Sequence, residues 1–480
     1  MIVGDGAVEQ DLSSTPIGAA TGPGVIESPG RTLRVGLVLL NSIVAFEAMA
    51  VTTVMPLVED DLGALWLYGW VFSAFFLGSL VGVVLAASAA DRMRPWIPMV
   101  AGVAVFLVGL VVAGAAPSML VLVVGRALQG LGAGTMPAIA YVCVGRSFPA
   151  AERPRMLAWL SSSWMIPAVA GPLLAAWIGE TVGWRWVFLG LLPLTALFGV
   201  VALVGIRVVP SSDHPDAPHN LVPAIGIASG AGVLLAALAA STWWVVLVGA
   251  AIGVVVVAPA YRRLTPPGVV RAAVGLPATI AVRGLMSAGF HAVDVYVPFA
   301  VTTVRGASPL IGGLALMTGS FTWTLASWLQ VRWIVRFGPV WLVRVGMAAI
   351  AIGALVMIAV LVPGVPVASA LVAWGIAGFG IGLAWAPIMQ GALSRARHGR
   401  EGEITTAMQV TDMLGIALGT GLAGVIVAGL ERSTGRPTPG LLVTFVLGAA
   451  LCALGAALAP RLRFTLHGTG DPGSVAADRH

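Results

Sequence analysis

The stretch that decides the fold is residues 119–144, MLVLVVGRALQGLGAGTMPAIAYVCV, which contains a single charged side chain, Arg126. The hydrocarbon core of a bilayer is about 30 Å thick and needs ~20 apolar helical residues to cross it. Because backbone polar groups in lipid must be satisfied within the protein, such a run is expected to be a helix. The stretch therefore predicts a membrane-spanning helix with one buried cation and a series of glycines.

The composition of the whole chain matches that of this stretch. Of its 480 residues, 58% are hydrophobic and 10% are charged, whereas a soluble domain has roughly 45–50% apolar and about 25% charged residues. A water-soluble globule is excluded. The formal net charge of +6 would suggest nucleic-acid binding in a soluble protein. Here the arginines fall mainly in short segments between apolar runs, so we expect no nucleic-acid partner.

Fourteen apolar runs are long enough to cross a membrane. The sequence therefore predicts an all-α polytopic membrane protein with fourteen spans. Their approximate limits are 35–57, 66–90, 96–115, 119–144, 156–178, 184–208, 220–240, 242–260, 274–301, 308–331, 338–362, 366–392, 403–430 and 438–460.

The distribution of arginines predicts the orientation. With a cytosolic N-terminus, nineteen arginines fall in inside loops and tails, and only Arg185, Arg305, Arg432 and Arg436 fall outside. Positive residues are enriched on the cytosolic side, so the bias supports an even number of spans. We expect a multi-pass protein of the cell membrane, inner or plasma, with both termini cytoplasmic and in contact with membrane lipid.

The runs are arranged as six, then two, then six, a pattern of internal repetition typical of secondary transporters. The predicted parts are a disordered cytosolic tail at 1–32, an N-terminal six-helix bundle at 33–208, a linker with two extra transmembrane helices at 209–272, a C-terminal six-helix bundle at 273–460 and a cytosolic tail at 461–480.

The N-terminal half carries one acidic residue and three short motifs that are informative together. They are Glu47, nine residues before Pro56; the loop motif Asp91-Arg92-Met93-Arg94-Pro95; the fourth-span motif with Arg126, Gln129, Gly130, Gly132 and Gly134; and Gly171-Pro172 in the fifth span. Together they resemble the major facilitator superfamily, specifically its fourteen-span drug:proton antiporter family. The resemblance covers about residues 33–460 and is strongest in the fourth span. Arg94 and Pro95 depart from the usual loop motif, and Glu47 stands where the family usually has Asp.

This resemblance implies a major facilitator fold of two six-helix bundles plus two inserted transmembrane helices. It also implies alternating access driven by the proton gradient, without a cofactor. Asp91 and Arg92 would latch the cytosolic side, and Gly171 and Pro172 would belong to the antiporter signature.

Glu47 lies near mid-membrane, where an ionisable side chain is costly and is a candidate functional group. It is expected to carry a proton. Arg126 is always protonated and is its natural partner, releasing Glu47 when a proton or a cationic substrate arrives. The alternative is a packing bridge between the first and fourth spans.

The ninth span carries Arg283, Ser287, His291 and Asp294 at spacings of four, four and three residues, which place them on one helix face. Such a face is expected to line a proton or substrate path. His291 is suited to titration near physiological pH. We expect His291 and Asp294 to take part in proton coupling, with cation recognition as the alternative role of Asp294, and Arg283 to line the substrate cavity. Alternatively, Arg283 and Asp294 merely help to neutralise each other's surroundings.

Further candidates for the substrate cavity are Gln129 in the fourth span and residues of the tenth and thirteenth spans. Gln409 and Asp412 share a face of the thirteenth span, although Asp412 is alternatively a salt-bridge partner in the cytosolic leaflet. Phe321 and Trp328 recur at helical spacing in the tenth span. Aromatic rings hold organic cations by cation–π contact, but such a stripe also suits a lipid-facing or core surface.

Several signals are absent from the sequence. It has no GxxxxGK[ST] loop for ATP and no HExxH motif. Cys143 and Cys452 have no metal-ligand spacing. We therefore expect no enzyme, no catalytic residue, no metal and no cofactor.

The favoured hypothesis is proton-coupled export of small amphipathic or cationic drugs, with protons and a small-molecule substrate as the partners and no obligate protein partner. The alternatives are a dedicated metabolite, siderophore or lipid transporter of the same fold, and a non-transporting membrane receptor or scaffold.

Overall fold

The computed structural model describes residues 30–149, 152–211, 221–395 and 401–463, and these residues form helices joined by short turns. The predicted tails lie almost wholly outside the described residues. The helices are α1 (Arg31–Leu62), α2 (Tyr68–Ala90), α3 (Trp96–Gly114), α4 (Met119–Ser147), α5 (Arg153–Ser162), α6 (Met165–Thr181), α7 (Arg185–Leu189), α8 (Leu191–Ile206), α9 (Leu221–Leu238), α10 (Trp243–Leu264), α11 (Leu276–Asp294), α12 (Val297–Phe299), α13 (Pro309–Phe337), α14 (Pro339–Met357), α15 (Ser369–Leu393), α16 (Glu401–Thr434) and α17 (Thr438–Leu458), with short 3-10 or π turns at Leu65–Leu67, Val269–Arg271, Ala300–Val304, Ile358–Leu361 and Ala459–Leu462.

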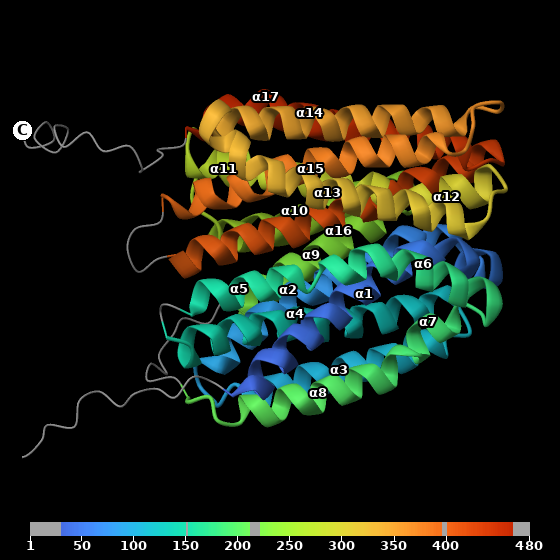
Figure 1. Ribbon diagram of the computed structural model, residues 1–480. Coiled ribbons are helices and arrows are strands. Elements are labelled where there is room, and N and C mark those ends of the chain that lie inside the picture. The colour runs from blue at the N-terminus through green and yellow to red at the C-terminus, as the bar shows by residue number, and fades with distance from the viewer. Residues whose placement is uncertain (1–29, 150–151, 212–220, 396–400, 464–480) are drawn as a thin grey trace, which may run out of the picture.

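Fourteen helical segments among the described residues are long and apolar enough to cross a membrane, which confirms the expected number of spans. Some spans are made of two helices, such as α5 with α6 and α7 with α8. The long helices run roughly parallel to one another (Figure 1). An all-helical membrane protein is thereby confirmed.

The helices form two groups with the same internal packing. In α1–α8, α4 packs on α2 and α3, while α1 packs on α6 and α8. In α11–α17, α15 packs on α13 and α14, while α11 packs on α16 and α17. Each group occupies its own side of the molecule in Figure 1. This repetition is the structural counterpart of the six-two-six pattern in the sequence.

The two groups meet along two seams, α2 against α16 and α6 against α13. The inserted pair, α9 and α10, packs on the first seam, with α9 contacting both α2 and α16. The inserted pair therefore contacts both groups.

The outer ends of the two groups, meaning the ends that the arginine distribution assigns to the outside, are joined directly. The Tyr68 hydroxyl donates to the Val295 carbonyl (3.2 Å), and the Tyr68 and Tyr296 rings stack with centroids 4.9 Å apart. The Ser308 hydroxyl donates to Glu180 (3.1 Å). These contacts hold the outer ends of the two groups together.

A break in the fifth span has a local cause. Pro167 has no N–H to donate to the carbonyl four residues earlier, that of Ser163, and the chain turns between α5 and α6 at this point. The Ser163 carbonyl instead accepts a hydrogen bond from the Ser42 hydroxyl (3.1 Å), and Asn41 donates to the Ser163 hydroxyl (2.7 Å). The hydrogen bonds at this break thus attach the end of α5 to α1.

Candidate functional site

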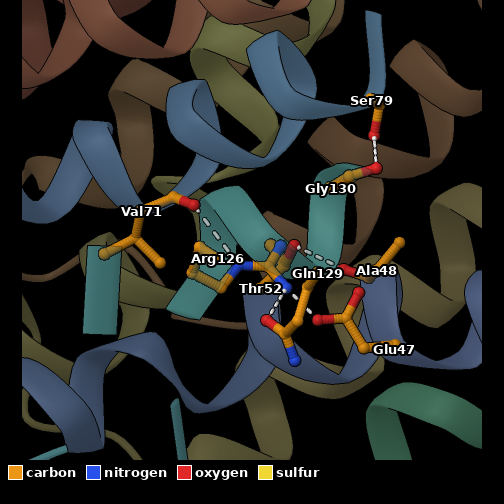
Figure 2. A network of polar contacts seen from close by, with 8 residues as sticks. All are labelled: Glu47, Ala48, Thr52, Val71, Ser79, Arg126, Gln129 and Gly130. Carbon is orange, nitrogen blue, oxygen red and sulfur yellow. Dashed lines mark hydrogen bonds and ion pairs between the residues drawn. The ribbon is translucent and has the colours of Figure 1, made fainter. Parts of the chain in front are cut away.

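A buried ion pair joins α1 to α4. Glu47 and Arg126 are 0% and 1% exposed, and one Arg126 nitrogen, Nη1, donates both to a Glu47 oxygen and to Oε1 of Gln129 (3.0 Å for the latter). The Arg126 Nε donates to the Val71 carbonyl of α2 (3.3 Å). Figure 2 shows the guanidinium held between these three helices. The contact expected between Glu47 and Arg126 is present.

This network leaves hydrogen-bonding capacity unused. Among the described residues, the Glu47 Oε2 and Gln129 Nε2 atoms are buried and have no hydrogen-bond partner. A buried polar atom without a partner costs about 1–3 kcal/mol. Such atoms suit a group that binds transiently, such as a proton, a water molecule or a polar part of a substrate.

The glycines of α4 explain how Arg126 reaches this position. A side-chain carbon at Gly130 would collide with the Phe75 carbonyl oxygen, and one at Gly134 would collide with that of Ser79. Both positions therefore need glycine for α4 to approach α2 so closely. At this spacing the Arg126 guanidinium lies over the Phe75 ring, 4.2 Å from its centroid.

A second ion pair lies in the C-terminal group, between α11 and α16. Arg283 donates from Nε and Nη2 to the two Asp412 oxygens (2.8 and 3.0 Å), and the Ser287 hydroxyl donates to the same carboxylate. The Arg283 guanidinium lies over the Trp385 ring, 3.2 Å from its centroid. Arg283 is therefore paired with Asp412 and not with Asp294, which contacts a different residue.

Asp294 lies at the end of α11 beside an aromatic cluster. Its Oδ1 accepts a hydrogen bond from Trp374 Nε1 (3.0 Å). The Phe290 ring packs on Trp374 (4.9 Å between centroids) and on His291 (5.2 Å). Trp323 packs on Phe290 (6.4 Å). We call Phe290, Trp323, Trp374 and Trp385 the aromatic cluster.

The aromatic cluster connects the two acids of the C-terminal group, because Trp323 also packs on Trp385 (5.3 Å), under Arg283. His291 faces both groups of helices: its ring contacts Phe76 of α2 (6.2 Å), and its Nδ1 lies 2.9 Å from the Ser287 carbonyl. Three of the four predicted ninth-span residues thus contact the aromatic cluster. They are Arg283, His291 and Asp294.

The predicted tenth-span aromatics lie outside the cluster. Phe321 and Trp328 are 61% and 75% exposed. The face of α13 that packs on α15 carries Gly319 and Trp323 instead. The sequence analysis overlooked Phe290 and Trp323. The signal that could have indicated Trp323 is its place four residues after Gly319, on the close-packing face of its helix.

The remaining candidates occupy the edges of this region. Gln409 is half-buried on α16, one turn before Asp412. Gly171 faces Met49 of α1, since a side-chain carbon there would lie 3.3 Å from the Met49 Cβ. Pro172 faces α13, because a carbon at Gly313 would lie 3.0 Å from the Pro172 carbonyl oxygen. The predicted antiporter signature therefore lies where α6 meets both α1 and the opposite group.

The loop motif lies at the inner end of the N-terminal group. Asp91 accepts a hydrogen bond from Arg146 of α4 (3.3 Å), and Arg146 also donates to the Ala90 carbonyl (2.9 Å). Arg92 follows on the exposed turn after α2. The Asp91–Arg146 ion pair lies within one group of helices.

No group of three or more metal-ligating side chains occurs within the described part of the chain. Comparison with known proteins then identifies the family, because the model of the Major Facilitator Superfamily matches residues 37–420. The chain belongs to the major facilitator superfamily. It is therefore a multi-pass membrane transporter of small molecules and not an enzyme.

Named relatives agree with the resemblance in the sequence. A probable multidrug-efflux transporter of Mycobacterium tuberculosis is 28% identical over 444 residues, covering 88% of this chain and 93% of the relative. The multidrug transporter protein MdtP of Bacillus subtilis is 31% identical over 177 residues, covering 37% of this chain and 32% of the relative. The resemblance to the major facilitator superfamily is thereby confirmed, and these relatives are themselves named as drug transporters.

Solved structures support the fold alone. An auto-inhibited peptide transporter of the POT family is similar over 92% of this chain and 99% of that chain, with a TM-score of 0.69 and 15% sequence identity. At that identity, the likeness carries no information about substrate.

Proposed function

We propose that this transporter is a proton-coupled exporter of small amphipathic or cationic drugs. The observation that carries the proposal is the fully buried Glu47–Arg126 pair, with one carboxylate oxygen left without a partner. A fully buried ion pair is costly to maintain, which favours a functional role for it. The names of the relatives favour drugs over nutrients as substrates.

In this proposal, Glu47 is the proton carrier of the N-terminal group. A proton that neutralises Glu47 removes its attraction to Arg126, so the link between α1, α2 and α4 loosens. The Gln129 amide remains beside Arg126 and holds the guanidinium while the carboxyl group is neutral. Arg126 stays charged throughout and favours the ionised form of Glu47, so that the carboxyl group releases its proton to water when the site opens to the cytoplasm.

In the C-terminal group, we assign substrate recognition to Asp294, His291 and the aromatic cluster. A carboxylate beside several aromatic faces attracts organic cations while tolerating different shapes. Asp412 is held by Arg283 and Ser287 and is assigned to coupling between α11 and α16. Asp91 and Arg92 are assigned to latching the inner side, and both termini are assigned to the cytoplasm.

Dye transport in inside-out membrane vesicles tests this proposal. The unaltered protein is expected to take up a fluorescent cationic dye in exchange for protons. Glu47→Gln should abolish dye-driven proton movement, and Asp294→Asn should weaken dye uptake. Asp60→Asn is the matched control, because Asp60 is an exposed acid on the same helix as Glu47.

Two outcomes would contradict the proposal. Unchanged exchange in both variants would remove Glu47 and Asp294 from their roles. No flux from the unaltered protein over a broad panel of dyes would favour a dedicated metabolite, siderophore or lipid substrate, or a non-transporting role.

A further inference from the structure

A cavity of about 440 Å³ lies apart from the ion pairs and the aromatic cluster, at the outer end of α16 beside the turn between α9 and α10. The C-terminal end of α9, the turn that follows it and one helix of the C-terminal group, α16, therefore build it. Its walls combine apolar side chains, two hydroxyls and one guanidinium, from Leu238, Ala240, Ser241, Val425, Gly429, Arg432 and Ser433.

Arg432 is the charged group of this cavity, and its orientation is set by two hydrogen bonds. Its Nε donates to the Ala428 carbonyl of α16 (3.2 Å), and its Nη2 donates to the Ala239 carbonyl after α9 (3.4 Å). None of the ion pairs between described residues includes Arg432. The nearest acid in sequence, Glu431, lies near Glu59 of α1, and these two like charges repel each other. The cavity therefore carries a positive charge that no acid of the described chain pairs with.

The neighbouring residues place the cavity at the depth of lipid headgroups. Trp243 and Trp244, directly after the α9–α10 turn, are 76% and 56% exposed. Exposed tryptophans of membrane proteins gather at the boundary between hydrocarbon and water. Leu238 and Val425 add an apolar wall to the same cavity. A ligand that fits has one anionic group and one apolar part.

We propose that this cavity binds an anionic phospholipid of the outer leaflet, with the phosphate on Arg432 and the start of an acyl chain against Leu238 and Val425. A guanidinium donates two hydrogen bonds to a phosphate in parallel, which favours this group over a simple halide. Because α9 contacts both α2 and α16, a lipid held here braces the inserted pair against the seam between the two groups. The site does not depend on what the transporter carries.

The chain offers three informative variants for testing this site. Arg432→Gln removes the charge. Gly429→Phe adds a bulky ring at the cavity wall, and the first carbon of that side chain meets open space because no atom lies within 4 Å of a side-chain carbon built at Gly429. Arg436→Gln is the matched control, since Arg436 is another exposed outer arginine but does not line the cavity.

The experiment compares the purified full-length proteins by native mass spectrometry and by thermal unfolding. Each is titrated with phosphatidylglycerol, phosphatidylcholine or inorganic phosphate. The unaltered protein and Arg436→Gln should retain one more phosphatidylglycerol molecule than Arg432→Gln and Gly429→Phe. Only the first two should gain thermal stability from that lipid beyond the gain from phosphatidylcholine.

Equal lipid retention in all four proteins would overturn the proposal. Protection by inorganic phosphate equal to that by phosphatidylglycerol would also overturn it, because the cavity would then bind a free anion. The measured unfolding temperature without lipid separates a misfolded variant from one that has only lost the site.

Discussion

Gly69 on α2 and Gly424 on α16 face one another across the seam between the two groups, with backbone against backbone. A side-chain carbon at Gly69 would lie 2.8 Å from the Gly424 Cα, and one at Gly424 would lie 2.9 Å from the Gly69 Cα. Beside them, the Ser73 hydroxyl donates to the Ala417 carbonyl (2.7 Å). This contact depends on the absence of side chains and holds the outer ends together.

Gly424→Ala is therefore predicted to disfavour closure of the outer side. Insertion of a methyl group into a packed contact costs about 1–3 kcal/mol, so the population should move toward an arrangement with the outer ends apart. Spin labels at Trp66 and Arg436 report this as a longer distance between the two groups. Gly429→Ala is the control, because a side-chain carbon there meets nothing within 4 Å. The same distances in both variants would show that the glycine contact does not limit closure.

Glu47 and Arg126 are predicted to be coupled in stability as well as in transport. Glu47→Met leaves a buried guanidinium without its carboxylate and should lower the free energy of unfolding by about 3–5 kcal/mol. The double variant Glu47→Met/Arg126→Met removes both charges and should recover most of that loss, while remaining inactive in proton exchange. Unfolding in detergent and vesicle transport measure the two effects. A double variant as unstable as the single one would mean that the pair is not what the single substitution disrupts.

Trp374 is predicted to act on cationic substrates through its ring. Trp374→Phe removes the hydrogen bond to Asp294 but keeps an aromatic ring beside Phe290. Trp374→Leu removes both, and loss of a cation–π contact of about 0.5–2 kcal/mol should raise KM for a cationic dye roughly 2- to 30-fold. The KM for a neutral dye of similar size should change less, and Trp374→Phe should lie between.

Trp333→Leu is the control for this prediction, since Trp333 packs on Phe337 and Phe379 away from Asp294. An equal rise in KM for the cationic and neutral dyes would assign Trp374 to packing alone.

The parts of the molecule that could be predicted from sequence follow from the length of apolar runs and from rare charges within them. The number of spans follows from hydropathy, because a bilayer requires a minimum apolar length. The contact between Glu47 and Arg126 could be anticipated because the first and fourth spans each carry a mid-membrane charge, and two opposite charges in lipid favour pairing. Their role in proton coupling stays a prediction.

Other contacts between helices were harder to infer. The spacing of Arg283 and Asp294 places them on one face, but eleven residues separate them by about 16 Å along a helix, which is too far for contact. Arg283 instead forms an ion pair with Asp412, which lies on another helix. Phe321 and Trp328 show the same limit, because a periodic stripe does not reveal which side of a helix faces its neighbours.

The fourth-span glycines give a last prediction with an internal control on the same helix. Gly130→Ala would push a methyl group against the Phe75 carbonyl oxygen, so α4 must move away from α2. Because Arg126 reaches the Val71 carbonyl from α4 (3.3 Å), the substitution should weaken that bond, lower stability by about 1–3 kcal/mol and reduce transport. Gly145→Ala, on the same helix with open space around it, should instead be neutral or stabilising by up to about 1 kcal/mol through helix propensity. Thermal unfolding of the two variants decides the point: equal losses would mean that α4 tolerates no added methyl group anywhere, and equal gains would mean that the approach of α4 to α2 is looser than the Gly130 contact requires.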